Sequence, residues 1–282
     1  MPTAMLDGIA TYYEIYGIGT PILMCAPGGF DATIDKWRTA SAWTGIDAVK
    51  SLGAEHMLIL YDRRECGESG GRVERLSWPG YARHGKALLE HLKIDSAWIM
   101  GGCMGCSVAL GFGAVYPEAT RGLLLHWPVG GYRWKVNSRN RFTRHYNFAK
   151  QNGLRAVIER ARGGKSFWMD PEGGPWATEI VRTEEFAESF ATQNLDRYLG
   201  IVFTTGQSLF DRDTAPGAEP EEVLGVAVPA LIIPGDDPSH ATSGAHYLRE
   251  LLPKADFWDI MPPEQTTPKV CDRLLEFCRQ NA

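Results

Sequence analysis

Residues 97–117 constrain the fold more than any other stretch of the chain. Residues 97–100 are a short apolar run typical of a fully buried strand, and residues 106–116 predict a buried helix that ends before a proline. Between them lies a Gly-Gly-Cys-Met-Gly turn centred on Cys103. A reactive side chain at such a junction lies on a strained corner above the sheet, where crowded backbone favours glycine on both sides. The stretch predicts an α/β fold with Cys103 as a candidate nucleophile.

This turn resembles the nucleophile elbow of the α/β-hydrolases, with cysteine where most members of that family have serine. The resemblance covers nearly the whole chain outside residues 129–226. Two other interpretations stay open. The uncharged run over residues 96–117 is long enough to suggest a membrane span, although its glycines and polar flanks argue against one. Alternatively, Cys103 is an inert buried thiol.

Composition narrows the class of protein. The chain has 282 residues and a net charge of −5, which argues against nucleic acid or an anionic membrane surface as partner. We expect a cytoplasmic protein because no apolar signal opens the sequence. The six cysteines are scattered, without a second pair at zinc-like spacing. We therefore expect reduced thiols, no metal and no cofactor.

Apolar runs alternate with helical segments along most of the chain, which predicts a mostly parallel sheet flanked by helices. Residues 129–226 interrupt this alternation with many aromatic and charged side chains, and they are too numerous for a simple loop. In the α/β-hydrolases, an insert between the sixth and seventh strands is a helical cap over the active site. We accordingly expect a hydrolase core from residues 1–128 and 227–282, with residues 129–226 as the cap.

A glycine pair follows the expected strand over residues 21–25, where backbone N–H groups can approach a substrate closely. By resemblance, the N–H of Gly29 or Phe30 and the N–H of Met104 would stabilise an oxyanion. The alternative is an ordinary tight turn.

The family order is nucleophile, acid, then histidine. The acid is expected after the seventh strand, where Asp236 and Asp237 stand, and we favour Asp237 because Asp236 is more easily interpreted as a turn residue. The histidine is expected in the loop after the last strand. That loop has Glu264 and Gln265 but no histidine, so the chain departs from the family here.

Two histidines are candidates to replace it. His126 ends the strand expected beside the elbow strand, and His240 lies on the same loop as the candidate acids. Both loops open at the carboxyl edge of the sheet, where ligands bind in this architecture. Cysteine also needs less activation than serine, because a thiol pKa of about 8.5 falls further at a helix N-terminus. Hydrolysis of the acyl-enzyme still needs an activated water, for which His240, His126 or Glu264 are candidates.

Three side chains are candidates for contact with the substrate. Trp127 and Trp134 stand among aromatic residues that either line an apolar pocket or pack the cap on the core. Glu65 stands where a glycine is expected in a loop that resembles a conserved turn of the family, so it is predicted to face the site.

The sequence thus predicts a cysteine-dependent hydrolase that acts on an ester, thioester or lactone of a small, partly apolar compound. Its partner would be a small-molecule carbonyl substrate, with neither nucleic acid nor membrane, and its oligomeric state stays open, homo-oligomer included. Two alternatives remain. Cys103 and Cys106 form a C-x-x-C that suits thiol redox chemistry. The missing histidine also fits a lyase or a ligand-binding member of the fold.

Overall fold

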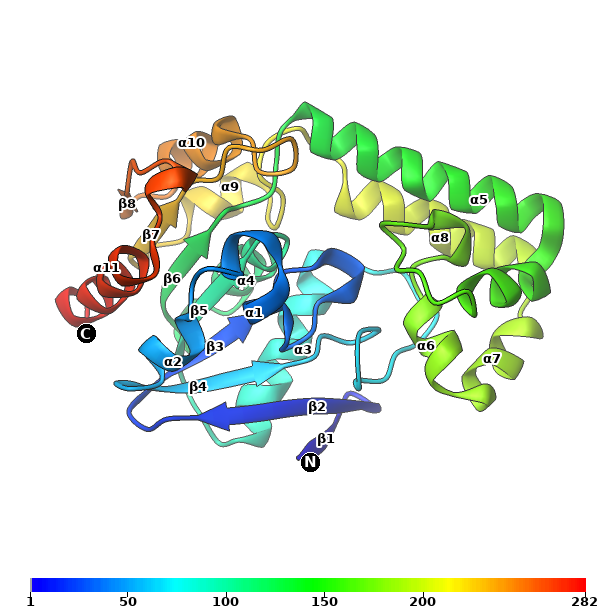
Figure 1. Ribbon diagram of the computed structural model, residues 1–282, viewed down its shortest axis with the longest axis horizontal. Coiled ribbons are helices and arrows are strands. Elements are labelled where there is room, and N and C mark those ends of the chain that lie inside the picture. Colours follow the sequence, from blue (N-terminus) through cyan, green and yellow to red (C-terminus); the bar gives the residue numbers. More distant parts are fainter. Residues whose placement is uncertain (1) are drawn as a thin grey trace.

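The computed structural model describes residues 2–282, which form one eight-stranded sheet with helices on both faces (Figure 1). The strand order is β1-β2-β4-β3-β5-β6-β7-β8, with β2 antiparallel to both its neighbours and the remaining pairs parallel. The predicted mostly parallel sheet is therefore confirmed. The strands are β1 (Thr3–Leu6), β2 (Ile9–Tyr16), β3 (Thr20–Cys25), β4 (His56–Tyr61), β5 (Ala97–Gly102), β6 (Thr120–His126), β7 (Ala230–Ile233) and β8 (Ala255–Phe257).

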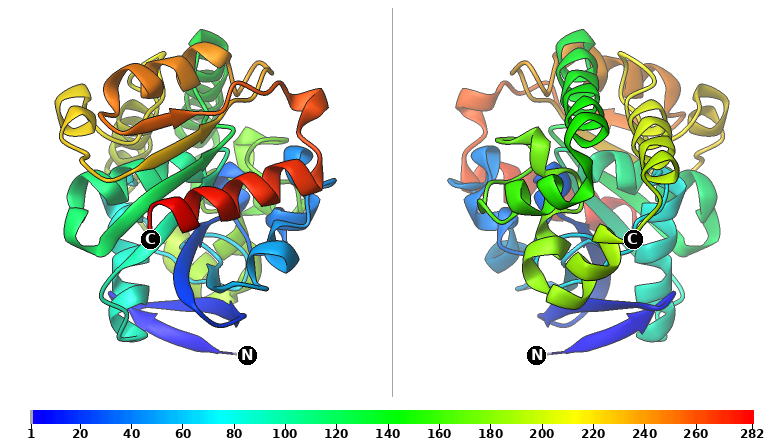
Figure 2. Two further views of the ribbon diagram at one scale, coloured as in Figure 1. Left: turned by 90° about the vertical axis from the view of Figure 1, so that its left-hand side faces the viewer. Right: turned by 90° about the vertical axis from the view of Figure 1, so that its right-hand side faces the viewer.

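The central strands are apolar along their whole length because helices cover both faces of a parallel sheet. Alternate residues of β3 show this: Leu23 joins the cluster under α3 (Trp78–His91) and α4 (Gly105–Val115), whereas Ile22 joins the cluster on the opposite face. That opposite face is covered by α1 (Lys36–Thr39), α2 (Ala48–Leu52) and α11 (Thr267–Gln280), and Figure 2 shows α11 lying across it. The remaining helix of this part, α10 (Thr242–Leu251), follows β7.

Residues 129–226, here called the helical insert, connect β6 to β7. They form α5 (Tyr132–Ala161), α6 (Ala177–Arg182), α7 (Glu184–Ala191), α8 (Leu195–Leu209) and α9 (Pro220–Leu224), with one short 3-10 turn at Pro171–Gly173 between α5 and α6. Helix α5 breaks at Gly153, which has φ 79°, and packs along α8 (Figure 1). Three separate helices, α6, α7 and α8, therefore divide residues 177–209.

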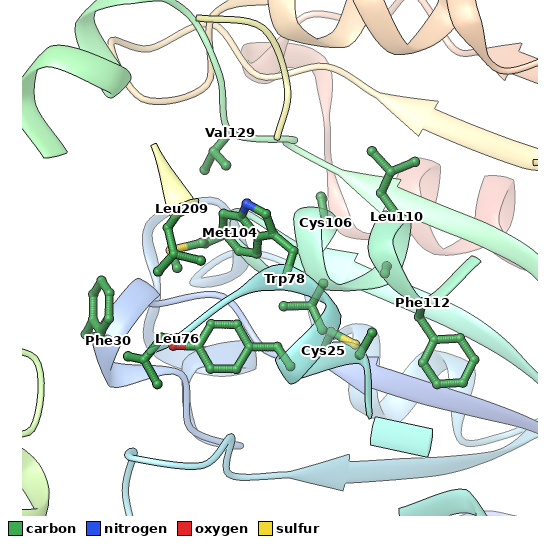
Figure 3. Packing of buried hydrophobic residues seen from close by; sticks show 14 of the residues in the cluster. Cys25, Phe30, Leu76, Trp78, Met104, Cys106, Leu110, Phe112, Val129 and Leu209 are labelled. Carbon is green, nitrogen blue, oxygen red and sulfur yellow. The ribbon is translucent and has the colours of Figure 1, made fainter. Parts of the chain in front are cut away.

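The insert shares one continuous apolar cluster with the sheet. Figure 3 shows Leu209 of α8 close to Met104 at the start of α4 and to Trp78 of α3. The Phe30 ring, from the loop after β3, lies 5.6 Å from the Phe142 ring of α5. This packing fixes the position of the insert over the carboxyl ends of the central strands.

The uncharged run over residues 96–117 is divided between β5, the turn at Cys103 and α4, and most of its side chains belong to the apolar core. Helix α4 has 11 residues, of which the first nine are buried under the sheet. Across residues 2–282, no helix is both long enough and apolar enough to cross a bilayer.

Candidate active site

Cys103 lies in the turn between β5 and α4 with φ 53°, a left-handed conformation that costs an L-residue about 1–3 kcal/mol. The flanking glycines are required sterically. A Cβ atom on Gly101 would lie 2.4 Å from the Gly105 carbonyl oxygen, and one on Gly105 would lie 2.1 Å from the Cys25 carbonyl oxygen. Cys103 is partly exposed, whereas the other five cysteines are buried. The predicted strained corner is present, and it presents one accessible thiol.

His240 faces this thiol from the loop between β7 and α10. Its Nδ1 atom lies 2.8 Å from Asp237 Oδ2, while Asp237 Oδ1 accepts hydrogen bonds from the backbone N–H groups of Ser239 and His240 at 2.7 and 3.0 Å. The carboxylate therefore fixes both the loop and the ring. With Nδ1–H donating to Asp237, the buried Nε2 atom has no other polar partner among residues 2–282 and is directed at Cys103. Asp236 is exposed and makes no such contact, so the structure pairs His240 with Asp237.

The negative charge of the Cys103 thiolate and the positive charge of the His240 imidazolium stabilise each other. Burial opposes ionisation of the Cys103 thiol, but the charge and hydrogen bond of His240, together with the backbone N–H groups of Met104 and Gly28, hold the pKa of Cys103 below its usual value. Burial likewise opposes protonation of His240, yet the Cys103 thiolate and Asp237 raise the pKa of His240. The hydrogen bond from His240 lowers the pKa of Asp237 to about 2. Each charge therefore favours the other, and the pair favours the ionised forms, a thiolate beside an imidazolium.

The backbone N–H groups of Met104 and Gly28 also stabilise the ionised form of Cys103 and help to lower its pKa. Met104 directly follows Cys103, and Gly28 lies in the loop after β3, where its φ is 113°. Gly28 stands one residue earlier in the chain than the expected donor. Gly29 lines the neighbouring cavity, whereas the Phe30 ring is buried against aromatic rings of the insert. The glycine pair was the feature of the sequence that indicated an N–H donor in this loop. The N–H group that stabilises the Cys103 thiolate belongs to the first glycine of the pair, Gly28.

A cavity of about 320 Å³ opens above Cys103, between the sheet edge and the helical insert. Its floor consists of Gly28, Gly29, Cys103, Met104, Ser239 and His240, and its roof consists of Trp134, Asn137, Ser138, Arg141 and Trp168. A larger hollow of about 610 Å³ between α3 and α8 contains neither cysteine nor histidine, so it is not the site of this chemistry. Trp134 thus lies where a substrate-contacting residue was predicted.

Comparison with known proteins identifies the fold. No family model matches the sequence. The thermophilic esterase of Thermogutta terrifontis superposes with a TM-score of 0.63 at 19% identity, over 99% of this chain and 98% of its own. The enol-lactonase of Burkholderia xenovorans superposes with a TM-score of 0.62 at 16% identity, over 99% and 100%. A mutant of CumD, a meta-cleavage product hydrolase of Pseudomonas fluorescens, gives 0.64 at 17% identity, over 100% and 98%. This chain has the α/β-hydrolase fold.

One curated relative is similar in sequence. It is a protein of Azorhizobium caulinodans whose provisional name is carbamate hydrolase RutD, and it is 31% identical over 125 residues. The match covers 44% of this chain and 43% of the relative, so the chain matches less than half of that protein's length.

Gln265 occupies the loop after β8, where the α/β-hydrolase resemblance led us to expect a histidine. Its amide donates to the carbonyl oxygens of Pro234 and Ile260 at 2.7 and 2.9 Å. Its oxygen accepts from Trp127 Nε1 at 2.7 Å and lies 3.1 Å from His126 Nε2. Gln265 therefore ties this loop to β6 and β7. The Trp127 ring, 5.4 Å from the His240 ring, packs behind His240 and does not line the cavity.

His126 does not reach the cavity, so the structure does not support its predicted role as a catalytic partner. It pairs with Gly102 in the sheet, and its ring turns to the α1 face, 4.8 Å from the Trp43 ring. Burial lowers the pKa of His126 to about 4. Its backbone contributes instead, since the His126 carbonyl oxygen accepts from the Cys103 N–H at 3.2 Å.

Glu65 also lies away from the cavity, contrary to prediction. Its carboxylate is buried and pairs with Arg64 Nε at 2.8 Å, and its own φ is 66°. The positive φ explains why a glycine was expected at this position. Glu264, a candidate to activate water, is exposed at the surface.

Cys106 is a structural thiol. Its Sγ donates to the carbonyl oxygens of Gly101 and His126 at 3.1 and 3.3 Å, and burial raises its pKa well above the usual value. Such a thiol is a poor partner for thiol–disulfide exchange. Within residues 2–282, no group of three or more His, Cys, Asp or Glu side chains is placed to hold a metal ion.

Proposed function

We propose that this chain is a cysteine-dependent hydrolase that cleaves an ester, thioester or lactone of a small, partly apolar compound through an acyl-enzyme on Cys103. The observation that carries the proposal is the alignment of Asp237, His240 and Cys103, with the backbone N–H groups of Met104 and Gly28 also favouring the thiolate. Nucleophile, base and orienting acid in this order are the requirement for acyl transfer.

In the first half of the reaction, the Cys103 thiolate attacks the substrate carbonyl carbon and forms an S–C bond. The carbonyl oxygen becomes an oxyanion, which the N–H groups of Met104 and Gly28 are placed to stabilise. His240 then gives its Nε2 proton to the departing alkoxide or thiolate as the C–O or C–S bond breaks. The products are the leaving group and an acyl-thioester on Cys103.

In the second half, neutral His240 accepts a proton from a water molecule, whose oxygen attacks the thioester carbonyl. The carboxylic acid leaves and the thiolate returns beside the imidazolium. The hydrogen bond from His240 Nδ1 to Asp237 stabilises that charge and keeps the ring in place. Through the loop after β7, the chain supplies both acid and base from positions three residues apart.

The comparisons support this class of reaction, because the names of similar proteins include an esterase, an enol-lactonase and a carbamate hydrolase. We extend the proposed substrates to carbamates on that ground. The walls formed by Trp134 and Trp168 suit a compound with a flat or apolar body, and we propose that the helical insert acts as the cap that excludes water. The position of Cys106 argues against the redox alternative.

Steady-state kinetics on a panel of activated esters, thioesters and lactones test the proposal. We expect Cys103→Ala and His240→Gln to lose turnover, while Cys106→Ala, which removes the neighbouring buried thiol, retains Cys103-dependent activity if folded. Circular dichroism checks the fold of each variant. Turnover that survives in Cys103→Ala would show that another group is the nucleophile.

A further inference from the structure

Arg141 is the one guanidinium in the wall of the cavity above Cys103. Among residues 2–282, no carboxylate lies within 4.0 Å of its guanidinium, so Arg141 forms no ion pair. Neighbouring arginines of α5 find partners away from the cavity. Arg139 donates to the Phe210 carbonyl oxygen and to Gln207, and Arg144 pairs with Glu172 at 2.9 Å. Arg141 alone brings an unbalanced positive charge to the site.

Two contacts with Trp168 hold Arg141 in place. Its Nε donates to the Trp168 carbonyl oxygen at 3.3 Å, and its guanidinium carbon lies 4.9 Å from the centre of the Trp168 ring. The Trp168 ring is itself anchored, because its Nε1 donates to the Gly28 carbonyl oxygen at 3.2 Å. Trp168 therefore links Arg141 to the backbone of Gly28, which also lines the cavity above Cys103. Its terminal nitrogens make no hydrogen bond with the described part of the chain.

The partly buried charge of Arg141 has an energetic cost that no carboxylate among residues 2–282 offsets. Partial burial lowers the pKa of Arg141, since the charge has lost water without gaining an acid. The group nevertheless stays protonated, because guanidinium does not lose its proton in proteins. A planar fork with free N–H donors that lines a cavity is complementary to a carboxylate.

We propose that the substrate carries a carboxylate, which Arg141 binds while Cys103 attacks a carbonyl group elsewhere in the same molecule. This inference rests on the proposed function and narrows its substrate class to esters, thioesters or lactones that are also carboxylic acids. The other cation at the cavity, His240, is already matched by Cys103 and Asp237. One free guanidinium suits one negative charge, which favours a carboxylate over a phosphate dianion.

The remaining roof residues fit such a molecule. Trp134 is nearly buried and lies on the same helix as Arg141, so apolar surface adjoins the cation. Asn137 and Ser138 supply polar atoms on the turn before Arg141. The substrate would therefore have a reactive carbonyl at the floor, an apolar middle and a carboxylate at the roof.

Matched substrates test the charge directly. We would compare kcat/KM for 3-acetoxybenzoate against its neutral amide, and for the phenyl half-ester of adipic acid against its neutral amide. A charge-assisted hydrogen bond predicts that wild type prefers the acid by about tenfold or more in at least one pair. We expect Arg141→Gln to lose this preference and Arg141→Lys to keep part of it. Arg133→Gln removes an exposed charge from the same helix and should leave the preference unchanged.

Alkylation separates this inference from the proposed function. N-iodoacetylglycine and its neutral amide both transfer a carbon to the Cys103 sulfur with loss of iodide, and neither requires turnover. We expect the acid to react faster in wild type, and Arg141→Gln to remove the difference. A charge preference in alkylation without turnover of any ester would support the carboxylate site and contradict the hydrolase. Turnover with no charge preference in either assay, or a preference that survives in Arg141→Gln, would overturn the inference.

Discussion

The state of the Cys103 thiol depends on His240, and the substitution His240→Gln tests this dependence. In wild type, the imidazolium is the largest of the influences that oppose burial and lower the pKa of Cys103. Without it, burial dominates. The buried thiols that lack a neighbouring imidazolium show the size of that effect, since burial raises the pKa of Cys25, Cys66 and Cys278 to about 12.

The expected shift follows from these values. The N–H groups of Met104 and Gly28 remain in the variant, so the pKa of Cys103 should rise above its usual value without reaching that of the fully buried thiols. A rise in the pKa of Cys103 lowers the thiolate fraction at pH 7 by about tenfold for each pKa unit. Intrinsic nucleophilicity rises with pKa, so the loss in rate will be smaller than the loss in thiolate.

The assay is the rate of alkylation of Cys103 by iodoacetamide from pH 4 to pH 10, followed by intact mass. Wild type should react near neutrality, with a rate that rises through a low pKa. The rate for His240→Gln should rise only at alkaline pH. His246→Gln is the matched control, because His246 is exposed on α10 and stacks on Phe257 away from the cavity. If the profile of His240→Gln overlays that of wild type, the thiolate–imidazolium pair is wrong.

Three further outcomes are expected. Asp237→Asn should lower kcat by about 10²-fold or more, because the amide no longer stabilises the imidazolium of His240. For the same reason, the pKa of His240 in the pH profile of kcat should fall. An unchanged pH profile would show that Asp237 takes no part in the mechanism. Gly105→Ala should reduce the free energy of unfolding in urea by more than about 2 kcal/mol, since its Cβ would meet a carbonyl oxygen at 2.1 Å. Gly200→Ala, with open space around it in α8, should instead stabilise the protein by up to about 1 kcal/mol. Equal effects of the two substitutions would contradict the steric crowding between β5 and α4. Acidification from pH 6.5 to pH 4 should reduce the free energy of unfolding. Burial lowers the folded-state pKa of His84, His126 and His145 below that of the unfolded chain, so the unfolded state binds more protons. Equal free energies of unfolding from urea titrations at pH 7 and pH 5 would contradict the burial of these three histidines.

The sequence predicted the fold and the turn around Cys103 because both follow from local patterns. Apolar runs with the length of buried strands specify the sheet, and glycines at fixed spacing specify the corner between β5 and α4. The helical insert was located by the interruption of that alternation. The breaks between α6, α7 and α8 were not predicted because residues 177–199 contain neither glycine nor proline to mark them.

The choice between His126 and His240 could not be made from sequence. Both histidines lie at the carboxyl edge of the sheet, and they differ in the face of the sheet to which the imidazole ring turns. The pairing of His126 with Gly102 directs its ring away from the cavity, and Gln265 then fixes it there. Arg141 was missed for a related reason, because an arginine on a charged helix has the pattern of a solvated face. Only the packing of α5 over the sheet edge places it beside the cavity.

The central claim is a covalent intermediate on Cys103, and time-resolved intact mass with peptide mapping tests it most directly. Wild type mixed with an activated thioester or ester should gain one acyl mass on the peptide that contains Cys103, and this mass should disappear as product accumulates. Asp237→Asn should retain the adduct for longer, because the base that activates water is impaired. Turnover without an adduct on Cys103, or an adduct confined to another residue, would contradict the account.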